Sequence, residues 1–460
     1  MTDASVAGGD GGSRPDPAAH DARVRRLLEV VRADRPGPLA LRKDTSNLFR
    51  DPARPRGQRL DVRAFDHVLA VDADAHWIEA EGTTPYETLV DAALARGVLP
   101  AVVPELKSIT LGGAAAGVGI EASAFKYGLV HETLLEIDVL TGDGRVLSCS
   151  PANEHRDLFY GFANSYGTLG YALRLKAATV PVAPFVALQH RRFGNAEALF
   201  AAVEGEFEGD ADFLEGVAFA ADELCLTTGR FAAGVPYTSD YTYENIYYRS
   251  LRQKEVDYLS VRDFIWRWDT DWFWCSRNLG AEVPWLRRLY GRKRLGSRTY
   301  QRIMRWNARW GVTSALDRLR RRHGESVIQD VDIPIANAAA FLHFFQREIG
   351  IAPIWICPFA TTGASDRFPL YPLRPGARYV NFGFWDVIRT AARQPPHHFN
   401  RLVEQKVAEL GGIKSLYSDS FYDRAAFDRI YGGETYRVLK TKYDPGGAFP
   451  DLFDKCVSGL

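Results

Sequence analysis

The sequence predicts an α+β protein with more than one domain, and three observations support this. The chain has 460 residues, which is too long for a single hydrophobic core of ordinary size. Alternating apolar runs typical of β-strands are interspersed with segments of helical apolar spacing. The composition, 46% apolar and 25% charged, is that of a globular protein.

The N-terminus, the charge and the cysteines narrow the class further. Residues 1–22 are polar and lack a basic start followed by an apolar stretch, so we expect a disordered tail and not a secretory signal. No run of eighteen apolar residues occurs, so we expect no membrane span. Lys plus Arg and Asp plus Glu both number 57, which argues against a nucleic-acid partner. Five scattered cysteines without a C-x-x-C pair predict reduced thiols, no metal site and a cytoplasmic location.

The stretch 23–181 is expected to form the first domain. Its pattern begins with an apolar helical repeat and continues with short strands separated by polar turns. The clearest strand signal is a hairpin, in which two alternating runs flank the turn Thr141-Gly-Asp-Gly144. In chain order we expect a helix at 22–34, a strand running into a polar loop at 37–49, two strands at 67–82, a helix at 84–98, the hairpin at 133–150, and a helix, glycine turn and strand at 153–180.

The stretch 182–412 differs in composition from the first domain and is expected to form a second, α+β domain. Its segment 258–278 contains four tryptophans in twenty-one residues. The next segment, 281–310, carries nine Arg or Lys against one acidic residue, interleaved with aromatic side chains. Such an abrupt change in composition is typical of a domain that presents its own surface. The last stretch, 413–460, is expected to form a C-terminal segment.

The glycine-rich stretch "TLGGAAAGVGIEASAFKYGL", Thr110 to Leu129, is the strongest local signal. Gly117, Gly119 and Ala122 satisfy the G-x-G-x-x-A spacing of a nicotinamide dinucleotide fingerprint. That fingerprint requires a strand directly before the first glycine, whereas the nearest expected strand ends at Pro104. A site where small residues let a helix and a strand pack closely is an open alternative.

The segment "VVPELKSITLGGAAAGVGIEASAFKYGL" resembles the flavin-binding segment of the delta-24 sterol reductases, FAD-linked oxidoreductases of the vanillyl-alcohol-oxidase fold. The likeness continues through "GDGRVLSCSPANEHRDLFYGFANSYGTLGY", "VIQDVDIPI", "IAPIWICPF", "LYSDSFYDRAAFDRIYGG" and "AFPDLFDK", from about residue 25 to residue 457. The resemblance implies a two-subdomain, PCMH-type FAD-binding domain at 23–181, a substrate or cap domain at 182–412, and a C-terminal segment that returns to the flavin.

The resemblance also implies which residues hold FAD. Backbone N–H groups of glycine turns would bind its pyrophosphate. The expected cofactor residues are Arg42, Lys43, Thr45, Ser46 and Asn47 of a polar loop, Thr110, Leu111, Gly112, Gly113, Gly117, Gly119 and Ile120 of the glycine stretch, and Gly167, Thr168 and Gly170 of a second turn. Read without the family, the loop is an ordinary polar turn. Neither 42–50 nor 110–129 contains His or Cys, so we expect FAD to bind non-covalently.

In the sterol reductases an alkene is reduced and NADPH recharges the flavin, which implies an apolar substrate slot and a proton donor. Candidate donors are Tyr417, Asp419 and Tyr422, with Glu121, Lys126 and His131 as further candidates, and Glu105 and Lys107 as residues that fix the entry to the glycine stretch. Each tyrosine can equally be a structural residue. The expected slot is lined by Trp266, Trp268, Trp272, Phe273, Trp274, Trp355 and Phe359, although aromatic stripes more often form a core.

Two further hypotheses concern direction and location. On the same fold, the enzyme can instead oxidise an alcohol or sugar, or the chain can be a flavin- or lipid-binding scaffold without turnover. Residues 285–310 are predicted to form an amphipathic helix that makes peripheral contact with an anionic membrane, with a solvated helix as the alternative.

Overall fold

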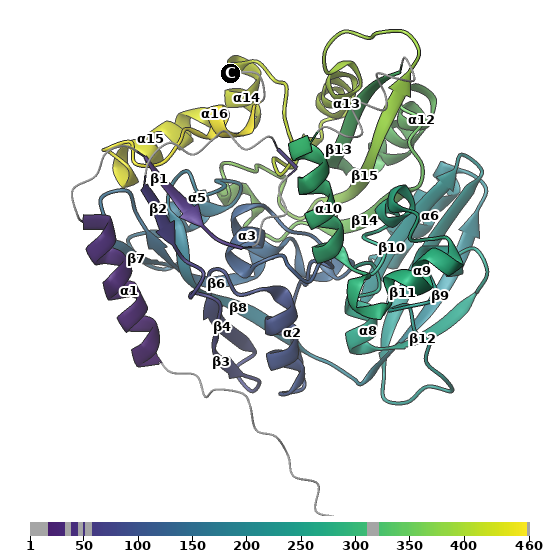
Figure 1. Ribbon diagram of the computed structural model, residues 1–460, viewed down its shortest axis with the longest axis horizontal. Helices are drawn as coiled ribbons and strands as arrows, with labels where there is room; N and C mark the ends of the chain where they lie inside the picture. The colour runs from purple at the N-terminus through teal and green to yellow at the C-terminus, as the bar shows by residue number, and fades with distance from the viewer. Residues whose placement is uncertain (1–16, 33–37, 45–48, 51–57, 311–321, 458–460) are drawn as a thin grey trace, which may run out of the picture.

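The structure is a computed structural model that describes residues 17–32, 38–44, 49–50, 58–310 and 322–457 (Figure 1). Within that part of the chain it contains a two-stranded, a six-stranded and an eight-stranded sheet, with helices on and between them. The predicted α+β class is confirmed.

The six-stranded sheet is built from the first third of the chain. Its strand order is β3 (Val68–Asp72), β4 (Trp77–Glu81), β8 (Tyr171–Pro181), β6 (Leu134–Leu140) and β7 (Val146–Cys149), with β5 (Val98–Pro100) paired to β8. The predicted hairpin is confirmed, since β6 and β7 pair antiparallel around the turn at Thr141, whose hydroxyl is hydrogen-bonded to Asp143. A parallel pair, β1 (Leu39–Arg42) and β2 (Gln58–Asp61), forms the small sheet.

Short helices cover this sheet, and two of them lie within the glycine-rich stretch. They are α2 (Tyr86–Leu94), α3 (Leu111–Ala116), α4 (Ala124–Tyr127), the 3₁₀ turn η1 (Val130–Thr133) and α5 (Arg156–Phe162). Small side chains from α3 and large ones from α2 and α5 share one core, in which Leu89, Ala115 and Leu158 are fully buried.

The eight-stranded sheet has two differently covered faces. Its strand order is β12 (Val256–Ser260), β9 (Phe185–Phe193), β11 (Glu223–Ala232), β10 (Phe213–Ala220), β14 (Ile354–Ala360), β15 (Arg378–Thr390), β13 (His323–Pro334) and β16 (Ile413–Lys414). Alternate residues along each strand point to opposite faces. Ile354 and Ile356 of β14 pack under α6 (Ala196–Glu206), α12 (Ala338–Glu348) and α13 (His398–Glu409) in a core of their own. Trp355 and Cys357 point the other way and join the core of the six-stranded sheet.

The C-terminal segment crosses back to the first part of the chain. Its helices, α14 (Arg424–Ile430), α15 (Gly433–Tyr443) and α16 (Leu452–Cys456), lie over β1, β2 and α5 in Figure 1. The contact is specific, because the Leu39 amide donates to the Ala448 carbonyl at 2.6 Å and the Lys440 ammonium donates to the Thr168 carbonyl at 2.8 Å.

Two expectations differ from the structure. Helix α1 (Pro17–Arg32) begins before the expected end of the tail, because His20 and Arg23 contact the buried Glu81 carboxylate. The rest of the tail lies outside the described residues.

The expected single helix at 285–310 is broken into α9 (Pro284–Tyr290), the turn η3 (Arg292–Arg294) and α10 (Ser297–Trp310). Gly291 and Gly296 break it, since both adopt positive φ angles, 69° and 147°. Among the described residues, no helix is long and apolar enough to cross a membrane. The domain boundaries stay predictions.

Candidate active site

The glycine stretch has a packed side and an open side. Thr110 caps α3, since its hydroxyl accepts a hydrogen bond from the Gly113 amide at 3.2 Å. At Gly112 the chain approaches Gly82 so closely that an added Cβ would lie 2.6 Å from the Gly82 carbonyl oxygen. Gly113 is exposed, and an added Cβ there would meet only the Thr110 hydroxyl. Close packing therefore explains Gly112, whereas Gly113 leaves the helix start free for a ligand.

The other predicted glycines form turns around this helix start. The Tyr166 amide donates to the Ala116 carbonyl, and the Tyr166 hydroxyl lies 3.4 Å from the Gly117 carbonyl oxygen. Gly119 is enclosed by three side chains, and Leu111 is buried while Ile120 is partly exposed. In the second turn Gly167 and Gly170 have φ angles of 75° and 151°, and Thr168 bonds back to the Ser165 carbonyl. The structure thus brings the two turns together at Tyr166.

Two partly buried cations meet at the same tyrosine. The Arg50 guanidinium lies 4.6 Å from the Tyr166 ring centroid, and the Lys455 ammonium donates to the Tyr166 carbonyl oxygen. Arg50 Nη1 donates to the Lys455 carbonyl at 3.3 Å, while Arg50 Nη2 is buried without a hydrogen-bond partner. Burial and the Arg50 charge lower the pKa of Lys455 to about 8. No carboxylate among the described residues forms an ion pair with either cation, so the site fits an anion such as a pyrophosphate.

The predicted polar loop leads into this site. Arg42 ends β1 and Lys43 follows it, and both are exposed. Thr45, Ser46 and Asn47 lie outside the described residues. Just beyond the loop, the Phe49 amide donates to the Tyr417 carbonyl at 3.0 Å. The first and last parts of the chain therefore meet beside the cations. Sequence reasoning missed Arg50 and Lys455, since no motif links two residues so far apart in the chain.

Tyr417 is the predicted proton donor that the structure places in this site. The Trp385 indole N–H donates to its hydroxyl at 2.8 Å, and the Tyr417 ring lies 5.8 Å from the Phe49 ring. Burial and the neighbouring Asp330 charge raise the pKa of Tyr417.

The other two predicted donors contact different residues. Tyr422 packs against Tyr431, and burial followed by the charge of Glu404 raises its pKa. Asp419 is partly exposed, and its carbonyl oxygen accepts a hydrogen bond from Lys414.

Two aspartates that sequence reasoning did not assign lie beside Tyr417. Asp330 and Asp332 of β13 point to the face of the eight-stranded sheet that meets the first domain, because Val331 and Ile333 fill the opposite core. Asp332 accepts hydrogen bonds from the Tyr371 hydroxyl and the Asn381 amide, both at 2.7 Å. Burial raises the pKa of Asp332 to about 6, and burial with the Asp332 charge raises that of Asp330 to about 8.

The predicted aromatic slot residues are buried in the structure. Trp266, Trp268, Trp272, Trp274, Trp355 and Phe359 are each at most 5% exposed. Trp272 stacks on Phe49 with ring centroids 5.6 Å apart, and Phe273 lies 4.5 Å from Trp385. These contacts join the aromatic cluster to the Tyr417 site, whereas Phe359 stacks on Tyr379 elsewhere on the sheet. Their role as substrate wall stays a prediction.

Three carboxylates and one guanidinium are buried between the two sheets. The Arg267 guanidinium lies 2.9, 3.0 and 3.4 Å from Glu215, Glu121 and Glu105. Burial, then the charge of Glu121, raises the pKa of Glu105, and burial raises that of Glu121. Burial also opposes ionisation of Glu215, but Arg267 and the indoles of Trp355 and Trp268 lower its pKa overall.

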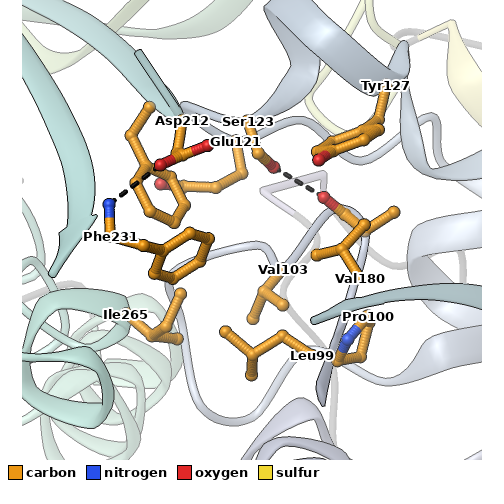
Figure 2. A pocket seen from close by; sticks show the side chains of 12 residues that line it. Leu99, Pro100, Val103, Glu121, Ser123, Tyr127, Val180, Asp212, Phe231 and Ile265 are labelled. Atoms are coloured by element: carbon orange, nitrogen blue, oxygen red, sulfur yellow. Dashed lines mark hydrogen bonds between the residues drawn. The ribbon is translucent and has the colours of Figure 1, made fainter. Parts of the chain in front are cut away.

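This cluster borders a pocket between β5 and β10, shown in Figure 2 with Leu99, Val103, Glu121 and Ile265 in its wall. The pocket has room for little more than a water molecule, so it does not fit a large substrate. Glu105 and Glu121 are therefore held in a domain contact.

The remaining predicted candidates lie apart from the Tyr417 site. Lys126 pairs with Asp212 at 2.9 Å on the surface, and the Lys107 amide donates to Asp269. His131 is buried with its ring 4.5 Å from that of Phe368, and burial lowers its pKa to about 4.

Comparisons with known proteins identify the cofactor. Residues 18–150 match the model of an FAD binding domain. The chain is 26% identical to the delta(24)-sterol reductase of Macaca fascicularis and 25% identical to the human enzyme, over 95% of this chain and 86% of each relative. The delta(24)-sterol reductase of Arabidopsis thaliana is 23% identical over 89% of the chain and 78% of that relative.

A more local match is cytokinin dehydrogenase 1 of rice, 30% identical over 33% of the chain and 30% of that relative. The unpartnered Arg50 Nη2, the partly buried Lys455 and the open Gly113 fit the anionic pyrophosphate of FAD. The chain is therefore an FAD-dependent oxidoreductase with a PCMH-type FAD-binding domain, related over most of its length to the delta(24)-sterol reductases.

Proposed function

We propose that the enzyme reduces a C=C bond in a hydrophobic, sterol-like or isoprenoid-like substrate, with NADPH as the source of the hydride. The observation that carries the proposal is the likeness to delta(24)-sterol reductases along 95% of the chain, which includes the second domain as well as the FAD-binding segment. When bound, FAD supplies hydride transfer at its N5 atom.

Different residues of the chain would bind the cofactor and line the substrate site. Arg50 and Lys455, with the open helix start at Gly113, would hold the pyrophosphate. The aromatic side chains Trp272 and Phe273 would provide an apolar, water-free surface for the alkene, since both are buried and contact the Tyr417 site. Tyr417 would place a hydroxyl group at that surface.

An oxidase or dehydrogenase of an alcohol or sugar is the second candidate, favoured by the local match to a cytokinin dehydrogenase. Such a reaction needs a group that accepts a proton from the substrate. Burial and the charge of Asp332 raise the pKa of Asp330, beside Tyr417, to about 8, so this carboxyl group is mostly protonated at neutral pH, which favours a site that donates protons. The reductase is therefore the preferred function.

An anaerobic titration tests the proposal. We expect NADPH to bleach the flavin band near about 450 nm, and a sterol with a carbon-24 double bond to restore it. Bleaching by an alcohol and not by NADPH would support the dehydrogenase. No response to either reagent would support a scaffold without turnover.

We further propose that the enzyme works in the cytoplasm and touches an anionic membrane through residues 285–310. Trp285 and Leu289 of α9 are 66% and 71% exposed, and Trp306 of α10 is 56% exposed. Lys293, Arg294 and Arg302 of the same segment are exposed as well. A segment that exposes both aromatic and basic side chains suits a lipid interface.

Not every basic residue of the segment is available to lipid. Arg287 is 2% exposed and pairs with Asp271 at 2.6 Å, so it belongs to the protein interior. Arg288 and Arg292 pair with Glu244 and Asp240 on the surface. Sedimentation with anionic and neutral liposomes tests the contact: Trp285→Ser and Lys293→Gln should each weaken binding to anionic vesicles. Equal sedimentation with both lipids would exclude it.

A further inference from the structure

The two aspartates of β13 differ in how they are held. Asp332 is fixed by the Tyr371 hydroxyl and the Asn381 amide. The Oδ1 atom of Asp330 has no hydrogen-bond partner, although it is buried. Asp330 as a whole is partly exposed, so its carboxyl group lies next to accessible space. An unpartnered buried oxygen is costly unless a ligand or a proton completes it.

The neighbouring strand leaves room at Asp330. Gly383 of β15 stands opposite Asp330 in the strand register. An added Cβ at Gly383 would lie 2.6 Å from Asp330 Oδ1 and 2.5 Å from the Trp385 ring. Because glycine has no side chain, the carboxyl group of Asp330 lies directly beside the Trp385 indole.

The groups that face Asp330 come from four parts of the chain. Asp332 shares its strand, and Tyr417 from the C-terminal segment is close enough for its pKa to be raised by the charge of Asp330. Tyr371 and Tyr166 also face Asp330: burial is the main cause that raises the pKa of both tyrosines, and the Asp330 charge is one of the smaller causes. The two cations of the pyrophosphate site, Arg50 and Lys455, contact Tyr166, and among the described residues neither forms an ion pair with Asp330.

The same contacts place Asp330 next to the cofactor segments. Tyr417 bonds through its carbonyl to Phe49, which follows the predicted pyrophosphate loop, and through its hydroxyl to Trp385. Tyr166 contacts Gly117 of the glycine stretch. The carboxyl group therefore lies where the flavin-binding segments, the aromatic cluster and the C-terminal segment meet.

We propose that Asp330 is the catalytic acid that donates the proton in alkene reduction, and that Asp332 and Tyr417 are positioning residues beside it. This rests on the proposed reductase function. The alkene gains a hydride at one carbon from the reduced flavin and a proton at the other carbon from the Asp330 carboxyl group. Two C–H bonds form and the C=C π bond breaks, leaving oxidised flavin and an Asp330 carboxylate. A nicotinamide then returns the hydride, and water returns the proton.

Asp330 suits this role better than Tyr417. Burial and the charge of Asp332 keep the Asp330 pKa near about 8, so the group is mostly protonated at neutral pH. The pKa of Tyr417 is raised well above its usual value, which makes it a weak acid. A buried carboxylic acid kept neutral beside a second carboxylate is a known way to obtain an acid at pH 7.

The first test separates the two half-reactions. Flavin-loaded wild type and Asp330→Asn are bleached with NADPH without oxygen and then mixed with a sterol carrying a carbon-24 double bond. We expect Asp330→Asn to be bleached within about twofold of the wild-type rate, and its reoxidation by the sterol to be slower by about 100-fold or more. Reoxidation at the wild-type rate would overturn the assignment.

The second test uses variants that move the acid without removing it. Asp332→Asn removes a like charge, so the pKa of Asp330 falls, and the decline in reoxidation rate at high pH should begin at lower pH. Tyr417→Phe removes the hydroxyl group that favours the Asp330 carboxylate, so the decline should begin at higher pH. Unchanged pH profiles in both variants would contradict the positioning roles.

A third measurement does not depend on turnover. Infrared difference spectra of the flavin-loaded protein should contain the C=O band of a protonated carboxyl group that disappears near about pH 8 and is missing in Asp330→Asn. If wild type is bleached by NADPH but not reoxidised by the sterol, the proposed function fails, and this band alone then decides whether Asp330 holds a proton. Absence of the band in wild type would overturn the assignment.

Discussion

Replacing Arg267 by methionine tests the contact between the two large sheets. The Arg267 side chain is fully buried and lies within 3.4 Å of the carboxylates of Glu215, Glu121 and Glu105. Methionine keeps the volume and removes the charge, so Glu215 would be left buried as an unpaired anion. Removing one partner of a buried ion pair typically costs about 3–5 kcal/mol.

The cost has an upper limit that depends on pH. Glu215 avoids being a buried, unpaired anion if it takes up a proton. Protonating a glutamate with an ordinary pKa of about 4.3 costs about 4 kcal/mol at pH 7 but only about 1.6 kcal/mol at pH 5.5. The destabilisation by Arg267→Met should therefore shrink as the pH falls. At pH 7 a loss of about 3–4 kcal/mol lowers Tm by roughly 6–16 °C if a unit of about 150–250 residues unfolds together.

Thermal unfolding followed by tryptophan fluorescence at both pH values measures this effect. The matched control is Arg262→Met, which breaks a contact with Asp91 of α2 made by α8 (Val261–Ile265), the short helix that ends just before Arg267. That pair is about half exposed, so its loss should cost at most about 1 kcal/mol. The double variant Arg267→Met with Glu215→Gln should recover most of the lost stability. Equal Tm values for Arg267→Met and Arg262→Met, or a loss that does not change with pH, would refute the reasoning.

Three further predictions concern the cofactor site and the N-terminal helix. Gly113→Leu should fold, as judged by circular dichroism, yet lose the yellow flavin, whereas Gly112→Leu should unfold, because its side chain would meet the Gly82 backbone; retention of flavin by Gly113→Leu would contradict this. FAD affinity should fall about tenfold per pH unit above about pH 8, because Lys455 must be protonated to bind an anion, and calorimetry should find no such slope in Lys455→Met. Burial opposes ionisation of Glu81, but His20, Arg23 and His67 lower its pKa, so its stabilisation is present above its ordinary pKa and is lost as the pH falls through the lowered value. Glu81→Gln should cost about 1.5–3 kcal/mol and increase hydrogen exchange in α1 at neutral pH; unchanged exchange would argue against it.

Local patterns sufficed for some parts of the fold and failed for others. The hairpin around Thr141 follows from alternation and turn residues, which act within a few positions of the chain. The apolar spacing of the basic segment predicts one helix, and this prediction was wrong. Gly291 and Gly296, which break the helix in the structure, are visible in the sequence as interruptions of the repeat. Arg287 is buried because Asp271 lies opposite it, and no local pattern contains that information.

The candidate site could be located but not assigned from the sequence. The resemblance pointed to Tyr417 and to the segment "VIQDVDIPI", yet nothing in that segment distinguishes Asp330 from Asp332. The difference arises in three dimensions, where Tyr371 and Asn381 bind one aspartate and Gly383 leaves space beside the other. Arg50 and Lys455 were missed for the same reason, because only the folded chain brings them to Tyr166.

The return of the C-terminal segment has a consequence for biosynthesis. Phe49 contacts Tyr417, and Tyr166 contacts Lys455, so the cofactor site is closed by residues that leave the ribosome several hundred positions after those it closes upon. The glycine stretch is synthesised early and lacks its contacts with the C-terminal segment until that segment has been synthesised. If Lys455 holds the flavin as proposed, we expect firm capture of the cofactor only after α16 has left the ribosome, so that cofactor loading would be a late, post-translational step.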